Sequence, residues 1–273
     1  MDRKLENKVA IVTGSGSGIG RASATLFAQH GATVVIAEFD EKAGAAVEND
    51  ICAKGGTAAF IRTDVTDAEN VESTVTETEK RFGGVHLLHN NAVEVTYVNQ
   101  QDRRVTELPT EVWHRILGVV LTGTYHCCKY ASAAMINAGG GSIINTATTD
   151  ALIGCPGLDA YTAAKGGVVA MTRSMAAGLA KDRIRVNAIC PGFVSTPNQM
   201  PWLADPDSRR EIESLHLMGI LSAEDIASFA LYLASDDSAK VTGGIYPIDS
   251  GYMAFKGAVD IMGALGGESA PTT

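Results

Sequence analysis

Short apolar runs alternate with longer amphipathic stretches over nearly the whole chain. Alternation of this kind predicts a parallel β-sheet with helices on both faces. We expect seven strands, at residues 9–12, 33–37, 58–61, 87–89, 142–145, 185–189 and 245–248. We expect helices at about 18–30, 41–54, 67–82, 110–138, 160–181 and 223–234. The pattern therefore predicts a doubly wound α/β fold.

The ends of this pattern set the expected domain limits. No internal repeat or linker divides the alternating elements, so we expect one domain over residues 1–253. Residues 196–218 contain three prolines, which predicts an irregular excursion with short helices that forms part of a binding site or a lid. The glycine-rich end at 254–273 is expected to be flexible or held at a subunit interface.

Composition excludes several classes of function. The net charge is −9 and no run of lysines or arginines occurs, so neither nucleic acid nor an anionic membrane is an expected partner. No apolar run approaches the roughly 18 residues of a membrane span, and the first residues lack a signal-peptide pattern. We therefore expect a cytoplasmic protein. The five cysteines and six histidines show no metal-ligand spacing, so no metal site is expected.

A glycine-rich turn, TGSGSGIG at residues 13–20, follows the first expected strand and opens the first helix. Gly14 and Gly18 tolerate the backbone angles of such a turn and allow a pyrophosphate to approach the chain. The backbone N–H groups around Ser17, Gly18 and Ile19 then meet the negative charge at the helix start. The alternative is a flexible turn without a ligand.

An acidic residue follows the second expected strand. Glu38 lies 18 residues after Gly20, near the position where a carboxylate accepts hydrogen bonds from the adenosine ribose. A carboxylate there repels a 2′-phosphate, and the turn contains no arginine, so both features favour NAD over NADP. Asp40 is a rival for this role, and a solvated strand-end glutamate is the alternative. In the same arrangement Asp64 and Val65 are expected beside the adenine ring.

Tyr161 and Lys165 are four residues apart in a helix-forming stretch, so their side chains share one face. A tyrosine that acts as a base near neutral pH needs its pKa lowered by about 3 units. An ammonium at about 5 Å supplies around 3 kcal/mol at an effective dielectric constant near 20. The spacing thus predicts a catalytic pair, and the alternative is a packed tyrosine beside a surface lysine.

Together these motifs resemble the short-chain dehydrogenase/reductase family over roughly residues 5 to 253. The resemblance is carried by four motifs: TGSGSGIG at 13–20, NNAV at 90–93, YTAAK at 161–165 and PGFVST at 191–196. It implies a Rossmann-type fold, a homotetramer, and hydride transfer between a substrate carbon and a nicotinamide. By the resemblance, Tyr161 is the acid/base, and Lys165 holds the nicotinamide ribose and lowers the tyrosine pKa.

The resemblance also places further site residues. The family's catalytic hydroxyl group falls on Thr148, where a serine is usual, and threonine keeps the donor and acceptor. Asn91 is placed at the cofactor, Pro191 under the nicotinamide, and Val194 and Thr196 at its carboxamide.

Two departures from the family pattern affect the expected chemistry. Val120 occupies the position of an asparagine that supports a water-linked proton relay, and valine cannot do so. A water or a backbone carbonyl must then complete the relay, or turnover is slow. Val93 replaces the last glycine of NNAG, which alters the loop above the cofactor.

These observations predict an NAD-dependent oxidoreductase that interconverts a hydrophobic secondary alcohol and its ketone. Glu94 and Asp150 are candidates for polar substrate contacts. Candidates for an apolar substrate pocket are Val93, Val95, Leu152, Met200, Trp202 and Leu203. The alternatives are an NADP-dependent ketone or 3-oxoacyl reductase and a catalytically weak NAD-binding scaffold or sensor.

Overall fold

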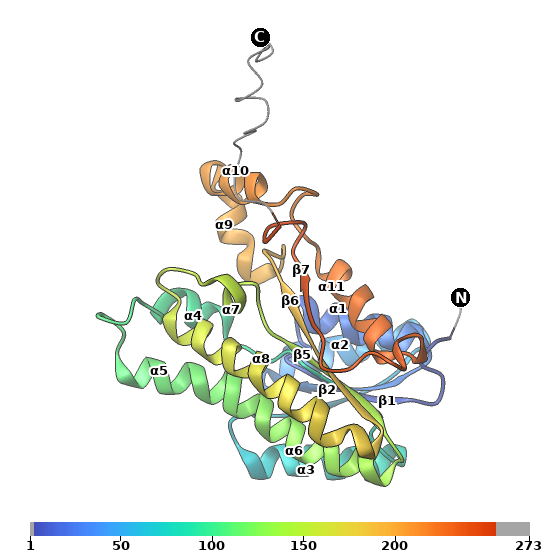
Figure 1. The fold of residues 1–273 in the computed structure, drawn as a ribbon. Coiled ribbons are helices and arrows are strands. Elements are labelled where there is room, and N and C mark those ends of the chain that lie inside the picture. The colour runs from blue at the N-terminus through green and yellow to red at the C-terminus, as the bar shows by residue number, and fades with distance from the viewer. Residues whose placement is uncertain (1–2, 255–273) are drawn as a thin grey trace, which may run out of the picture.

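A computed structural model describes residues 3–254 of the chain, which form a seven-stranded parallel sheet covered by helices (Figure 1). The strand order is β3-β2-β1-β4-β5-β6-β7, and all neighbouring strands are parallel. The strands are β1 (Val9–Thr13), β2 (Thr33–Glu38), β3 (Thr57–Arg62), β4 (Leu87–Asn90), β5 (Gly141–Thr146), β6 (Ile184–Pro191) and β7 (Ile245–Ile248). The predicted doubly wound Rossmann-type fold is confirmed, because buried parallel strands are continuous apolar runs that stand out in the sequence.

The helices that cover the sheet agree closely with the expected ranges. They are α1 (Gly18–Gln29), α2 (Glu41–Ala53), α3 (Ala68–Phe82), α5 (Thr110–Leu117), α6 (Gly123–Asn137), α8 (Asp159–Leu179) and α11 (Ala223–Ala234). Four shorter helices were not predicted individually: α4 (Val95–Gln101), α7 (Asp150–Ile153), α9 (Met200–Ala204) and α10 (Pro206–Leu215). Each is ten residues or fewer, too short for a clear helical period.

The expected helix over 110–138 is confirmed, because the chain is helical without a break from Thr110 to Asn137, but it contains a segment that was not predicted. A π-helical segment at Gly118–Thr122 separates α5 from α6. At this point the Thr124 hydroxyl group donates to the carbonyl oxygen of Val120, at 2.7 Å. Back-bonding of this kind often accompanies bends in helices, and periodicity alone does not reveal it.

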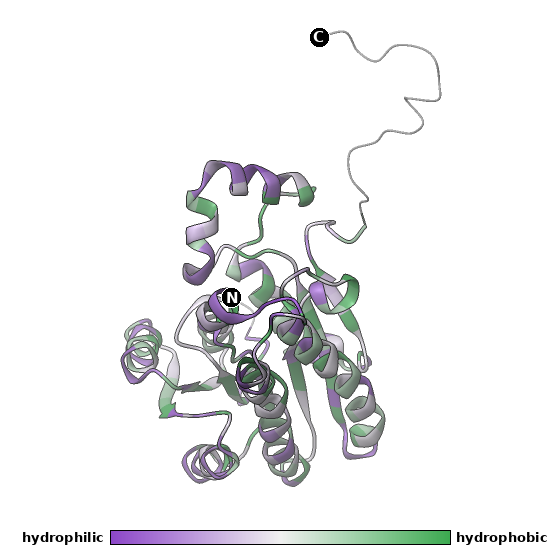
Figure 2. Ribbon diagram, turned by 90° about the vertical axis from the view of Figure 1, so that its left-hand side faces the viewer, coloured by the Kyte–Doolittle hydropathy of each residue, from purple (hydrophilic) through white to green (hydrophobic). Residues whose placement is uncertain are grey.

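Two apolar layers hold the helices to the sheet. Along β1, Ala10 and Val12 pack with α1, α2 and α11 on one face, whereas Ile11 packs with α3 and α6 on the other. This alternation follows from the two-residue period of a strand. The outward faces of the helices are largely hydrophilic (Figure 2).

The carboxyl ends of the strands define the edge at which a site is expected. The order of the strands reverses between β1 and β4, and the glycine-rich turn follows β1 at this point. The segment after β6 carries α9 and α10, which project beyond this edge (Figure 1). Apart from residue 254, the tail predicted to be flexible or interface-bound lies outside the described residues. Within residues 3–254, no helix is long and apolar enough to span a membrane.

Candidate active site

A cavity of about 570 Å³ lies at the carboxyl edge of the sheet. It is lined by most of the residues predicted for cofactor binding and catalysis: Gly14, Ser17, Gly18, Ile19, Asn91, Thr148, Tyr161, Lys165, Pro191, Val194 and Thr196. Three predicted residues, Glu38, Asp64 and Val65, do not line it. Residues from both halves of the sheet, far apart in the sequence, thus share one space.

The glycine-rich turn is tightly packed against the residues that follow β4. Gly14 has a φ of +61°, and a Cβ atom there would lie 2.7 Å from the Cα atom of Ala92. The Asn91 amide group donates to the carbonyl oxygen of Gly14, at 3.1 Å. Only glycine fits this backbone and this spacing, so the turn is held in one conformation at the cavity wall.

The first turn of α1 provides the polar groups that a pyrophosphate requires. The Ser17 side chain makes no capping hydrogen bond, and the first turn contains no acidic residue. The first N–H groups of a helix have no acceptor within the helix and carry a partial positive charge. Since Ser17, Gly18 and Ile19 line the cavity, these residues fit the phosphates of a dinucleotide cofactor.

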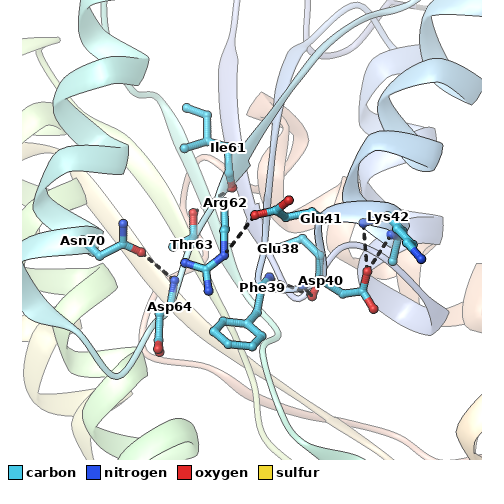
Figure 3. A network of polar contacts seen from close by, with 11 residues as sticks. Glu38, Phe39, Asp40, Glu41, Lys42, Ile61, Arg62, Thr63, Asp64 and Asn70 are labelled. Carbon is cyan, nitrogen blue, oxygen red and sulfur yellow. Dashed lines mark hydrogen bonds and ion pairs between the residues drawn. The ribbon is translucent and has the colours of Figure 1, made fainter.

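The Glu38 carboxylate is bound to the glycine-rich turn. Its Oε2 accepts from the backbone N–H of Gly16 at 2.8 Å. Its Oε1 accepts from those of Phe39 and Asp40 at 2.8 and 3.1 Å (Figure 3). A carboxylate has about four acceptor positions, so one remains for a ribose hydroxyl group. The rival residue, Asp40, instead caps α2 by accepting from Lys42 and Ala43.

The residues after β3 form a separate group at the same edge. Asp64 accepts from the backbone and the hydroxyl group of Thr66, and its own N–H donates to Asn70 (Figure 3). Val65 is buried against α6, where its carbonyl oxygen lies 3.0 Å from His126 Nδ1. These contacts fix the backbone that follows β3.

An exposed aromatic residue beside this group was not identified from the sequence. Phe39 is 57% exposed, and the Arg62 guanidinium group lies 4.7 Å from its ring centroid. Arg62 also forms an ion pair with Glu41 at 3.5 Å. The positive charge at the end of β3 therefore already has an anionic partner.

Tyr161 lies in the first turn of α8, whose start is fixed by a buried carboxylate. The Asp102 oxygens accept from the backbone N–H groups of Ala160 and Tyr161, at 3.2 and 2.9 Å. Asp102 is only 3% exposed, and it ends α4. This cap, which joins residues 59 positions apart, has no signal in the sequence.

Lys165 is buried one turn further along α8. Its Nζ donates to the carbonyl oxygen of Thr146 at 2.5 Å and lies 5.7 Å from the centroid of the Tyr161 ring. Burial lowers the pKa of Lys165 to about 8, and the nearby Cys190 opposes this effect. The ammonium form is therefore still favoured at neutral pH.

The pKa of the Tyr161 phenol depends first on its burial, and its lowering by Lys165 stays a prediction. Burial raises the pKa of the Tyr161 phenol above its ordinary value, and the charge of Asp150 raises it further. A hydrogen bond with Thr148 acts in the opposite direction. Removal from water disfavours the phenolate, and residue spacing gives no measure of that cost.

Thr148 and Asp150 are joined beside the phenol. The Thr148 hydroxyl group donates to Asp150 Oδ2 at 3.1 Å, and the Asp150 backbone N–H donates back to Thr148 Oγ1 at 3.3 Å. Burial raises the pKa of Asp150, and the hydrogen bond from Thr148 opposes that shift. Thr148 therefore contacts both the phenol and a carboxylate.

Val120 does not line the cavity, but it belongs to an apolar cluster against which Tyr161 packs. Val120 is buried in an apolar cluster with Ile116 and Ala164. Its carbonyl oxygen accepts from Thr124, while Lys165 donates to Thr146 instead. The backbone carbonyl that contacts the lysine is thus on β5 and not in the π-helical segment.

The residues that line the substrate end of the cavity are only partly those predicted from the sequence. Val93, Val95, Trp202 and Asp150 line it, as do the unpredicted residues Asn99, Asp102, Cys155, Phe193, His216 and Tyr252. Leu152, Met200, Leu203 and Glu94 do not line it, which corrects the prediction. Leu152 packs on the apolar cluster around Val169, Leu203 is buried, and Met200 is 49% exposed. Glu94 turns away to pair with Arg115 at 2.8 Å.

Metal-ligating side chains are a further kind of group that a site can contain. Among residues 3–254, no group of three or more histidine, cysteine, aspartate or glutamate side chains is placed to hold a metal ion.

Comparison with known proteins places the chain in a family. A family model described as enoyl-(acyl carrier protein) reductase matches residues 14–253. A cyclohexanol dehydrogenase from Acinetobacter sp. is 37% identical over 92% of this chain and 97% of its own length. A 2,5-dichloro-2,5-cyclohexadiene-1,4-diol dehydrogenase from Sphingobium indicum is 39% identical over 92% of this chain and 98% of its own length.

A solved structure agrees with these relatives. The crystal structure of a short-chain type dehydrogenase/reductase from Mycobacterium marinum superposes with a TM-score of 0.85 at 32% identity, and covers 93% of this chain and 98% of that one. The chain therefore belongs to the short-chain dehydrogenase/reductase family, oxidoreductases that use a nicotinamide cofactor, NAD or NADP.

Proposed function

We propose that this protein is an NAD-dependent dehydrogenase that interconverts a hydrophobic secondary alcohol and its ketone. The observation that carries the proposal is that Thr148, Tyr161 and Lys165 line the same cavity as the first turn of α1. A cofactor whose pyrophosphate lies at that helix start extends toward the tyrosine. The end of the cavity at α1 thus suits the cofactor, and the end at Tyr161 suits the alcohol or ketone.

Each of these side chains has a distinct part in the reaction. When bound, the nicotinamide cofactor supplies the group that accepts or returns a hydride. Tyr161 exchanges the proton of the alcohol, and the Thr148 hydroxyl group orients the same oxygen. Lys165, fixed by the carbonyl oxygen of Thr146, supplies positive charge beside the phenol and a donor for the nicotinamide ribose.

The charges at the adenosine end favour NAD. The Glu38 carboxylate lies against Gly16 at 2.8 Å, where it would repel a 2′-phosphate. Arg62, a cation near this position, is paired with Glu41. An NADP-dependent ketone or 3-oxoacyl reductase would need a free cation here, so these contacts argue against that alternative.

The walls of the substrate end support a ring-shaped apolar substrate. Val93, Val95, Phe193 and Trp202 provide apolar surface in the cavity. Apolar walls with a few convergent polar groups are typical of small-molecule sites. The names of the relatives, a cyclohexanol dehydrogenase and a cyclohexadienediol dehydrogenase, support a cyclic secondary alcohol. We extend the proposal to a homotetramer, which light scattering of the purified protein tests.

The test is NADH formation with a panel of cyclic, aryl and aliphatic secondary alcohols, run in parallel with NAD and NADP. We expect NAD-dependent turnover that Tyr161→Phe abolishes while NADH binding, followed by fluorescence, is retained. Tyr232→Phe, on the exposed side of α11, is the matched control and should keep full activity. Tight NADH binding without turnover of any alcohol or ketone would favour a scaffold or sensor instead.

A further inference from the structure

Asp150 is a charged side chain in the cavity that the proposed reaction does not use. It begins α7, two residues after Thr148, and lines the same cavity as Tyr161. Its Oδ2 accepts from Thr148, but its Oδ1 has no hydrogen-bond partner among residues 3–254. Within that range, no lysine, arginine or histidine forms an ion pair with it either. One carboxylate oxygen is thus available to a ligand.

This carboxylate carries two costs in the structure. Burial without a cation disfavours its charged form and raises the pKa of Asp150. Its charge also raises the pKa of Tyr161, which opposes removal of a proton from an alcohol. A hydrogen-bond donor on the substrate that reaches Oδ1 would offset both costs, because it stabilises the carboxylate and withdraws charge from the phenol.

The position of such a donor follows from how Asp150 lies relative to Thr148 and Tyr161. Asp150 Oδ2 accepts from the Thr148 hydroxyl group at 3.1 Å, and Thr148, Asp150 and Tyr161 line the same cavity. The Asp150 carboxylate is also close enough to the phenol for its charge to raise the pKa of Tyr161. A substrate whose reacting hydroxyl group lies at Tyr161 therefore brings the substituent on its neighbouring carbon close to Asp150.

We propose that Asp150 Oδ1 accepts a hydrogen bond from a second hydroxyl group of the substrate, so that the preferred substrates are cyclic diols with hydroxyl groups on adjacent ring carbons. The inference rests on the proposed function, because it takes the reacting alcohol to lie at Tyr161. The apolar walls at Val93, Val95 and Trp202 then contact the remaining ring carbons. Asp150 is a specificity-determining residue in this arrangement.

The test compares kcat/KM for 1,2-cyclohexanediol, as separate cis and trans isomers, with kcat/KM for cyclohexanol. The two alcohols differ only by the second hydroxyl group. We expect at least one diol isomer to be preferred by the wild-type protein, and Asp150→Asn to lower that preference by about tenfold to a hundredfold, the range for a hydrogen bond to a charged group. Asp150→Ala should lower it at least as far. Asp207→Asn, an exposed carboxylate on α10, is the matched control and should leave the preference unchanged.

The two substrates should respond in opposite directions. Loss of the Asp150 charge eases ionisation of Tyr161, so kcat/KM for cyclohexanol should rise while that for the diol falls. An equal fall for both substrates would show that Asp150 has only a structural role and would overturn the proposal. A larger Asp150-dependent preference for 2-aminocyclohexanol than for the diol would overturn it as well, because the carboxylate would then bind an ammonium group.

A binding measurement separates this inference from the proposed function. Tyr161→Phe protein saturated with NADH is titrated with the diol and with cyclohexanol, with and without Asp150→Asn. Tighter binding of the diol that depends on Asp150 supports the inference even if the wild-type protein oxidises neither alcohol. Equal binding of both alcohols overturns it even if both are oxidised.

Discussion

Replacement of Glu38 by glutamine should weaken NAD binding, although the two side chains have nearly the same shape. The carboxylate accepts three backbone N–H groups, with Oε2 on Gly16 and Oε1 on Phe39 and Asp40. The glutamine amide has one oxygen. If that oxygen keeps the two contacts at the end of β2, the amide nitrogen faces the Gly16 N–H, and two donors then meet.

The size of the effect follows from the contact that is lost. A hydrogen bond to a charged group contributes about 1.5–3 kcal/mol. At about 1.4 kcal/mol for each factor of ten, Glu38→Gln should weaken NAD binding by about tenfold to a hundredfold, since the glycine-rich turn is no longer held for the pyrophosphate. The affinity for NADP relative to NAD should rise, because the charge that repels a 2′-phosphate is gone.

Titration of the purified variants with NADH and NADPH, followed by fluorescence, measures both effects. Glu41→Gln is the matched control for NADH affinity alone, because Glu41 is exposed, lies three residues along the chain, and contacts Arg62 but not the turn. Equal NADH affinity for the two variants would refute the reasoning that Glu38 holds the turn. An unchanged NADP-to-NAD ratio in Glu38→Gln would refute the role of its charge in cofactor choice.

Three further predictions concern the fold around the site. His89 is fully buried, and burial first, then the charge of Lys165, lowers its pKa from 6.5 to about 4. Between pH 6.5 and 4 the unfolded chain therefore binds a proton at His89 that the folded chain does not. About 3 kcal/mol of the free energy of unfolding, present above pH 6.5, is lost as the pH falls toward 4. Urea unfolding across this range should show a smaller loss for His89→Asn than for the wild-type protein. Asp102→Ala removes the cap that holds the Tyr161 N–H. We expect kcat to fall at least tenfold while NADH affinity stays within twofold of wild type. An equal fall in kcat and in NADH affinity would contradict a positioning role for Asp102. Gly14→Ala would place a Cβ atom 2.7 Å from the Cα atom of Ala92 at a positive φ, so NADH binding should be lost together with about 1–3 kcal/mol of unfolding free energy.

The sequence was most informative where local pattern and structure coincide. The strands were placed to within two residues at either end, because most of them are buried and form apolar runs bounded by polar turns. The glycine-rich turn and the Tyr161–Lys165 pair also lie within single short segments. Their positions in the expected elements and their resemblance to family motifs predicted a shared site, and both groups line the cavity.

The sequence pattern did not predict contacts between segments that are far apart in the chain. The Asp102 cap on Tyr161 depends on how α4 packs against α8. The raised pKa of the Tyr161 phenol depends on burial and on Asp150, whereas spacing indicated only the nearby lysine. The π-helical segment at Gly118–Thr122 depends on backbone hydrogen bonding, which leaves the apolar periodicity intact. Each of these features depends on which residues are neighbours in the folded structure, and the sequence does not show those neighbours.

Transfer of a labelled hydride tests the central claim most directly. The purified protein is incubated with NAD and with the alcohol of the panel that reacts fastest, deuterated at its carbinol carbon, and the mass of the reduced cofactor is measured. A dehydrogenase of secondary alcohols should yield NADH that carries one deuterium, and Tyr161→Phe should yield none. Unlabelled NADH, or a panel in which no secondary alcohol reduces NAD, would contradict the account.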